Sequence, residues 1–116
     1  MKVLICDDEY SSRFVTKSCL DMSGYETIEA SSGEEALELV DKKKPDVIIV
    51  DYSLPRMSGL DVIKKLKRKI PVIVLTSEGF IEETEKELRK YASEYLTKPV
   101  LKEQIEKAIK KITGDE

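Results

Sequence analysis

Short apolar runs and amphipathic segments alternate along the whole chain. Residues 3–6, 47–50 and 72–75 are apolar throughout, which is typical of parallel strands that are buried on both faces. Residues 26–30 and 94–97 mix apolar and polar side chains, as strands at the edge of a sheet do. The pattern therefore predicts five strands, of which three are interior and two are edge strands.

An amphipathic segment with helical spacing follows each of these runs. Ser32 and Glu35 form the capping-box pattern that marks the start of the second helix. The fourth segment, residues 81–91, is almost entirely charged or hydroxyl-bearing between Ile81 and Leu88. It is either an ordinary solvated helix with i,i+4 pairs or, as we predict, a weakly anchored helix. The first and last helices are expected to bury apolar residues on one face, namely Phe14, Val15, Cys19 and Met22 in the first and Leu101, Ile105, Ala108, Ile109 and Ile112 in the last.

Strands that alternate with helices indicate βαβ units, a parallel sheet and helices on both of its faces. Two edge strands and three interior strands fit the order 2-1-3-4-5. We therefore predict the α/β class, with a flavodoxin-like, doubly wound (βα)5 fold and a five-stranded parallel sheet in that order.

Length and composition fit one α/β domain, which we expect to cover residues 1–116. The 20 Lys and Arg residues against 23 Asp and Glu residues give a net charge of -3, which argues against a nucleic-acid-binding module. No apolar run is long enough to cross a bilayer, and the amino terminus does not fit a secretory signal. Cys6 and Cys19 are expected to be small buried thiols in a reducing compartment, so we predict a cytoplasmic location.

Histidine is absent from the chain. This excludes histidine-based zinc sites, histidine-containing catalytic triads and any role as a phosphohistidine donor. If phosphoryl chemistry takes place here, the histidine must come from a partner.

Polar residues end four of the five predicted strands. Asp7 and Asp8 follow the first strand, Asp51 the third, Thr76 the fourth and Lys98 the fifth. Each alone is most simply a turn residue, a helix cap or a surface charge. Ligands of such sheets bind beyond the carboxyl ends of the strands, where the strand order reverses. Crowded carboxylates there favour Mg²⁺, and a neighbouring ammonium and hydroxyl suit phosphoryl transfer.

The sequence resembles the receiver domains of response regulators in two-component signalling, of the chemotaxis-regulator type. The resemblance rests on VLICDDE, VIIVDYSLPRMSGLDVI, PVIVLTS and EYLTKP, which are spread over essentially the whole chain. The most specific stretch is residues 51–59, where Asp51, Pro55 and Gly59 fall at the family's spacing. Chemotaxis regulators of this family are also a standard example of the strand order 2-1-3-4-5, so the two arguments for that order are not independent.

The resemblance implies Mg²⁺-dependent transfer of a phosphoryl group from a partner phosphohistidine to Asp51. Asp51 would be the phosphoacceptor and a Mg²⁺ ligand. Asp8 would bind Mg²⁺ directly and Asp7 mostly through water, while the backbone carbonyl of Ser53 completes the protein ligands. Lys98 would pair with the phosphoryl oxygens. The family catalyses only its own phosphotransfer and dephosphorylation, so a separate enzymatic activity is not expected.

The resemblance also implies a switch. Thr76 would move to hydrogen-bond the phosphoryl group, and Tyr95 would change rotamer with it. The signalling face would consist of the fourth helix, fifth strand and fifth helix. Ser53 and Glu78 occupy the positions that tune phosphoryl lifetime. The chain departs from the family at Ser77, where a smaller residue is usual, and at Tyr91, where glycine is common; Tyr91 either packs inward or marks a contact surface.

The implied partners are a sensor histidine kinase or phosphotransfer protein and a downstream protein target or a second copy of the chain. No direct contact with nucleic acid or membrane is expected. A haloacid-dehalogenase-type phosphatase is an alternative, but that family needs a second acid where this chain has Ser53. A scaffold that is never phosphorylated is another, although nothing structural requires four charged groups at one edge of the sheet.

Overall fold

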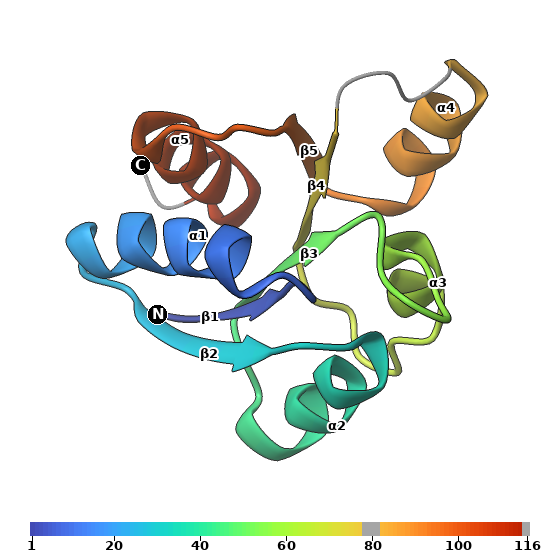
Figure 1. The fold of residues 1–116 in the computed structure, drawn as a ribbon, viewed down its shortest axis with the longest axis horizontal. Helices are drawn as coiled ribbons and strands as arrows, with labels where there is room; N and C mark the ends of the chain where they lie inside the picture. The colour runs from blue at the N-terminus through green and yellow to red at the C-terminus, as the bar shows by residue number, and fades with distance from the viewer. Residues whose placement is uncertain (78–81, 115–116) are drawn as a thin grey trace.

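The computed structural model describes residues 1–77 and 82–114. Within them, parallel strands form one five-stranded sheet in the order β2-β1-β3-β4-β5, which confirms the predicted α/β architecture (Figure 1). The elements are β1 Lys2–Cys6, α1 Tyr10–Met22, β2 Glu26–Ala30, α2 Gly33–Lys43, β3 Val47–Asp51, α3 Gly59–Lys64, β4 Val72–Thr76, α4 Glu82–Tyr91, β5 Glu94–Thr97 and α5 Lys102–Thr113.

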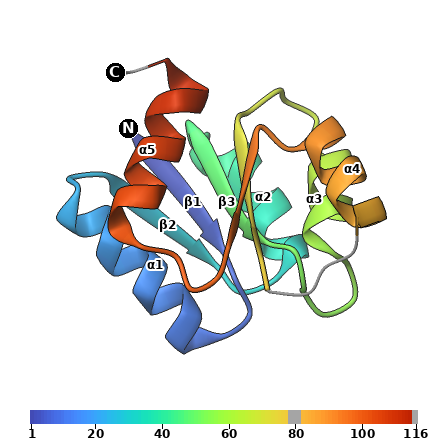
Figure 2. The ribbon, with the colours of Figure 1, turned by 90° about the horizontal axis from the view of Figure 1, so that it is seen from above.

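The helices cover both faces of the sheet, with α1 and α5 on one face and α2, α3 and α4 on the other (Figure 2). Successive residues of a strand point to opposite faces, so Leu4 and Val50 pack under α2 and α3 while Ile5 and Ile49 pack under α1 and α5. All four side chains are at most 1% exposed. The interior strands are apolar throughout because both of their faces are covered. Among the described residues, no helix combines the length and apolarity needed to cross a membrane.

The expected buried face of α1 is wrong for three of its four residues; the fourth, Cys19, is half-buried and packs against the core. Phe14, Val15 and Met22 are exposed, and the helix instead buries Thr16 and Leu20. Helix α1 packs against both β2 and α5, and this contact selects the face that carries the small threonine rather than the larger apolar residues. The Thr16 hydroxyl donates a 3.4 Å hydrogen bond to the Ser12 carbonyl, so its burial leaves no unpaired donor. The buried face was predicted from the helical spacing of apolar residues, whereas packing against neighbouring elements decided it.

The starts of three helices, α2, α3 and α5, refine the predictions. Ser32 caps α2 by accepting a hydrogen bond from the Glu35 amide, but the Glu35 carboxylate accepts from the Ser31 amide rather than from Ser32. Ser58 and Asp61 form a complete capping box at α3, which sequence analysis missed. Leu101 was expected on the buried face of α5, but it is the N-cap residue and is exposed.

Helix α4 buries little over its described side chains, residues 85–91. Leu88 is fully buried there, whereas Glu87 and Arg89 are exposed and Tyr91 is 41% exposed. Tyr91 is the last residue of the helix. The Lys64 ammonium lies 5.0 Å from the centroid of the Tyr91 ring. The prediction for Ile81 lies outside the described residues. One leucine therefore supplies most of the apolar contact that holds this half of α4 to the domain.

We predict that α4 opens more easily than α2, and that Leu88→Ala increases this difference. Hydrogen exchange of the amides of residues 85–91 should be faster than that of residues 36–43, because α2 buries both Ala36 and Val40. Leu88→Ala should speed exchange in α4 selectively. The matched control is Leu20→Ala on α1, also at 0% exposure, which should lower stability throughout by about 2–5 kcal/mol. Equal exchange in α4 and α2 would contradict the prediction.

Candidate functional site

Two buried carboxylates meet at the carboxyl edge of the sheet. Asp7 directly follows β1, and Asp51 is the last residue of β3. These strands are neighbours, with Cys6 paired to Val50, so the two aspartates lie side by side where the strand order reverses. Asp7 is 1% exposed and Asp51 is 6% exposed. Carboxylates so deeply buried require a compensating charge.

Lys98 supplies that charge from the end of β5. Its ammonium lies 2.6 Å from Asp51 Oδ2 and 3.1 Å from Asp7 Oδ2. The Lys98 amide donates to the Thr76 carbonyl at 2.7 Å, which fixes the start of the side chain, and the Lys98–Pro99 peptide bond is cis. Burial disfavours the charged ammonium, but the hydrogen bonds and negative charges of Asp51 and Asp7 outweigh burial and raise the pKa of Lys98. Lys98 therefore carries its charge at neutral pH.

The Asp51 carboxylate is held at both oxygens. Oδ2 contacts Lys98, and Oδ1 accepts a 3.0 Å hydrogen bond from the Ser53 amide. The following loop is closed by Gly59, whose amide donates to the Tyr52 carbonyl at 2.8 Å. A Cβ at Gly59 would lie 2.5 Å from the Asp51 carbonyl oxygen, so only glycine allows this close approach. These contacts fix the orientation of the carboxylate.

Asp7 is fixed in a similar way by the start of α1. Asp7 Oδ1 accepts a 3.0 Å hydrogen bond from the Glu9 amide. The Arg13 guanidinium donates to the Asp7 carbonyl at 2.7 Å and forms an ion pair with Glu29 on β2 at 3.0 Å. Helix α1 is thereby joined directly to the edge of the sheet that carries the carboxylates.

Asp7, Asp8 and Asp51 form a group that suits a divalent cation. Each offers a carboxylate oxygen, and these oxygens all lie within 4.8 Å of one another. Three carboxylates against the one ammonium of Lys98 leave a formal charge of -2 (that is, -3 + 1). Asp8 is exposed and so gives the group an open side toward solvent. Hard oxygen ligands, excess negative charge and solvent access are what Mg²⁺ requires.

Three further predicted residues, Thr76, Tyr95 and Ser53, lie in β4, in β5 and in the loop after β3. Thr76 ends β4 and is buried, and its hydroxyl donates to the Leu96 carbonyl at 3.4 Å. Tyr95 lies in β5, paired with Val74, and its hydroxyl points to α4. Ser53 is exposed, and its amide bonds to Asp51; a ligand role for its carbonyl stays a prediction. Glu78 lies outside the described residues.

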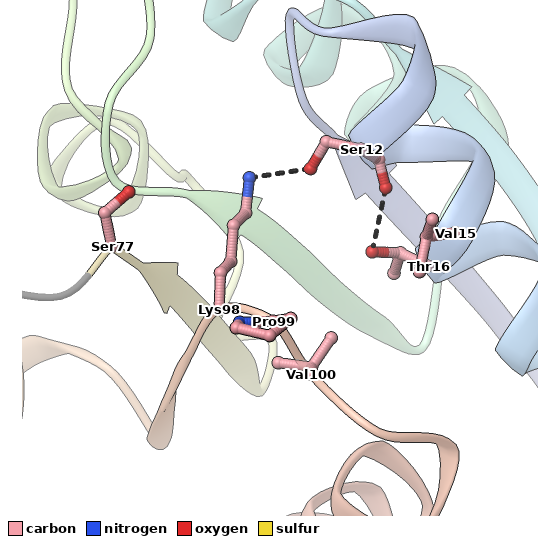
Figure 3. Close-up of a pocket in the computed structure, with 7 residues that line it drawn as sticks. All are labelled: Ser12, Val15, Thr16, Ser77, Lys98, Pro99 and Val100. Atoms are coloured by element: carbon pink, nitrogen blue, oxygen red, sulfur yellow. Dashed lines mark hydrogen bonds between the residues drawn. The ribbon is translucent and has the colours of Figure 1, made fainter.

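Ser12 is a site residue that was not predicted from the sequence. Its hydroxyl accepts a 2.7 Å hydrogen bond from the Lys98 ammonium (Figure 3). No pattern indicated this, because a serine in the first turn of a helix is common for local reasons. Beside the contact lies a cavity of about 670 Å³ lined by Ser12, Val15, Thr16, Ser77, Lys98, Pro99 and Val100. Ser77 reaches the rim of this cavity opposite Ser12 (Figure 3).

Cys6 is buried as predicted, and its thiol donates to the Ser32 carbonyl at 3.3 Å. Burial, and then the negative charge of Asp7, raise the pKa of the Cys6 thiol to about 12. The thiol is therefore protonated at neutral pH, which makes it a packing residue rather than a nucleophile.

Comparison with known proteins points to one family. The family model described as "Response regulator receiver domain" matches residues 3–110. The chain is 32% identical over 113 residues to "Sporulation initiation phosphotransferase F" of Bacillus subtilis, covering 95% of this chain and 91% of the relative. It is 37% identical over 116 residues to "Alkaline phosphatase synthesis transcriptional regulatory protein PhoP" of the same organism, covering 96% of this chain but only 48% of the relative.

Solved structures agree. A putative response regulator from Chloroflexus aurantiacus superposes with a TM-score of 0.88 at 30% identity, with 97% of each chain covered. The chemotaxis protein CheY4 of Vibrio cholerae superposes with a TM-score of 0.87 at 31% identity, covering 96% of this chain and 97% of that one. Both similarities extend over almost the entire chain.

We predict that Mg²⁺ stabilises the fold through the three carboxylates. Added Mg²⁺ should raise the free energy of unfolding, by about 2.7 kcal/mol at a hundredfold excess over its Kd. Asp8→Asn should weaken this effect while slightly stabilising the metal-free protein, because it removes one of three like charges. Denaturation with and without a chelator measures both. The control Asp41→Asn, an exposed aspartate on α2, should change neither; an unaltered Mg²⁺ effect in Asp8→Asn would place the metal elsewhere.

Proposed function

The chain belongs to the response regulator receiver domain family, and from this premise we propose that Asp51 is the residue that accepts the phosphoryl group. Receiver domains of two-component systems are phospho-accepting switches rather than classical enzymes. The observation that carries the assignment is the buried Asp51 carboxylate, which lies 2.6 Å from the Lys98 ammonium and belongs to the three-carboxylate group. The proposed nucleophile Asp51, the Lys98 ammonium and the candidate metal ligands therefore lie together at the carboxyl edge of the sheet.

In the proposed reaction an oxygen of Asp51 forms a bond to phosphorus as the P–N bond of a phosphohistidine breaks. The electron pair of that bond stays on the imidazole, which takes a proton from solvent. Lys98 transfers its contact from Asp51 Oδ2 to a phosphoryl oxygen and balances its charge. Asp7, Asp8, Asp51 and the Ser53 carbonyl would hold Mg²⁺, which when bound neutralises charge on the phosphoryl oxygens.

The phosphohistidine must lie outside residues 1–116, because these residues contain no histidine. We propose a sensor histidine kinase or a phosphotransfer protein as the donor. The chain spans about half the length of the transcriptional relatives that it matches. We propose that residues 1–116 act as one receiver domain, whose output is a contact with a downstream protein or with a second copy of the chain through the face made of α4, β5 and α5.

A polar cluster on α4 holds Tyr95 in its present position. The Tyr95 hydroxyl donates to Glu85 Oε1 at 2.5 Å and accepts from Arg89 Nη2 at 2.8 Å. The Arg89 guanidinium lies 5.0 Å from the centre of the Tyr95 ring and forms an ion pair with Glu85 at 2.9 Å. A change of the Tyr95 rotamer must break these contacts, so phosphorylation and the position of α4 are coupled in this proposal.

Thr76 links the site to this cluster. Its hydroxyl bonds to the carbonyl of Leu96, the residue that follows Tyr95. When Thr76 turns to the phosphoryl group it gives up that contact, and the strand beside Tyr95 loses one of its restraints. In this proposal the change at Asp51 thereby alters the balance between two positions of α4.

The assignment of Asp51 is tested by intact-mass spectrometry. Incubation with Mg²⁺ and acetyl phosphate should add one phosphoryl group, and Asp51→Asn should abolish the addition. The control Asp41→Asn should behave like the original chain. If neither acetyl phosphate nor a phosphorylated kinase gives an adduct, the chain is a scaffold. Rapid multiple turnover of a phosphate ester would instead identify a phosphatase.

We predict that Glu85→Ala releases Tyr95 in the unphosphorylated protein. Removing the acceptor at 2.5 Å should shift the Tyr95 ring part of the way toward its phosphorylated state. Fluorotyrosine labelling with ¹⁹F NMR reports this directly, with Tyr95→Phe to assign the signal. The matched control is Glu87→Ala on the same helix, which removes an ion pair to Lys64 at 3.0 Å and should leave the signal in place. An unchanged signal in Glu85→Ala would contradict the coupling.

A further inference from the structure

Lys98 is held by partners of two different kinds. An ammonium has three N–H donors, and within the described residues each has an acceptor: Asp51 Oδ2 at 2.6 Å, Ser12 Oγ at 2.7 Å and Asp7 Oδ2 at 3.1 Å. Two of these partners are carboxylates at the ends of β1 and β3. Ser12 is neutral and approaches from α1, on the side of the cavity (Figure 3).

Ser12 is itself rigidly placed. It is the third residue of α1, and its side chain is half-buried. The next residue, Arg13, ties the same helical turn to the Asp7 carbonyl at 2.7 Å and to Glu29 at 3.0 Å. The helical turn that carries the Ser12 hydroxyl is therefore tied to the sheet independently of Lys98, whereas Lys98 has a flexible four-carbon stem beside a cavity of about 670 Å³ that leaves the stem room to move.

The two carboxylate contacts do not survive the proposed reaction unchanged. Asp51 Oδ2 belongs to the group that becomes an acyl phosphate, and Asp7 belongs to the candidate metal group. Ser12 takes part in neither change. Of the three acceptors in the described structure, it is the one that can hold the ammonium in the same place before and after phosphorylation.

From this geometry we propose that Ser12 is a positioning residue for phosphoryl transfer, which acts by holding the Lys98 ammonium within reach of the phosphoryl oxygens. The proposal rests on the proposed role of Asp51. Electrostatic catalysis depends on a charge that is already in place when the transition state forms. Without the Ser12 hydroxyl, the ammonium is free to turn toward the cavity and water, and the rate falls although the charge is still present.

The test is the rate constant for phosphorylation by acetyl phosphate at saturating Mg²⁺. A hydrogen bond to a charged group is worth enough for roughly a tenfold effect, so Ser12→Ala should react about tenfold more slowly. Ser12→Thr should keep most of the rate and Ser12→Val should lose it, although these two side chains have the same shape. Ser11→Ala, at the exposed neighbouring position, should match the original chain. Equal rates for the Thr and Val variants would overturn the proposal.

A double-mutant cycle separates positioning from a merely structural role. If Ser12 acts through Lys98, then Ser12→Ala has no further effect in a Lys98→Ala background. The same tenfold loss in both backgrounds would show that Ser12 acts on the fold instead, and would also overturn the proposal. Thermal denaturation of each variant confirms that folded proteins are being compared.

A second measurement does not depend on phosphorylation. In the original chain the immobilised Lys98 ammonium should give a resolved ¹⁵N–¹H signal, because its protons exchange slowly with water. Ser12→Ala should broaden or abolish this signal and Ser12→Thr should keep it. An unchanged signal in Ser12→Ala would refute positioning by Ser12 and leave the role of Asp51 untouched. Failure of the original chain to take a phosphoryl group at Asp51 would refute the proposed function, and with it a role of Ser12 in phosphoryl transfer, but not the holding of Lys98 by Ser12.

Discussion

The contact between the Lys98 ammonium and the carboxylates of Asp7 and Asp51 joins the ends of β1, β3 and β5 at one edge of the sheet. Two carboxylates buried this deeply are unfavourable beside each other without a cation. The ammonium makes their burial tolerable but leaves excess negative charge when Asp8 is included. That imbalance is the physical basis on which we propose both metal binding and phosphoryl chemistry at this edge.

The same edge is connected to the part of the fold that is held least firmly. Thr76 is hydrogen-bonded to β5, and Tyr95 of β5 is hydrogen-bonded to Glu85 and Arg89 of α4. Over its described side chains, α4 itself depends on Leu88 for deep burial. The connection from Asp51 to the surface of α4 therefore consists of hydrogen bonds and the one buried side chain of Leu88. It does not consist of a tightly packed group of apolar side chains. Such an arrangement is suited to a shift between two positions of a helix.

Sequence alone predicted the strand order and the convergence of Asp7, Asp51, Thr76 and Lys98, because the apolar strands and the switch point fix where chain segments end. It did not predict that α1 buries Thr16 and exposes Phe14, since the buried face of a helix is chosen by its neighbours. Nor did it identify Ser12 or the Glu85 cluster. Those contacts join residues from different elements, and no local pattern reveals which side chains will meet.

The most direct test of the central claim is to locate the acyl phosphate chemically. Borohydride reduces an acyl phosphate to an alcohol and releases phosphate, so the phosphorylated aspartate becomes homoserine. After reaction with acetyl phosphate and Mg²⁺, reduction and peptide mass mapping, the account predicts homoserine at position 51 and an unmodified residue at positions 7 and 8. Homoserine at another carboxylate, or none after proven phosphorylation, would contradict it.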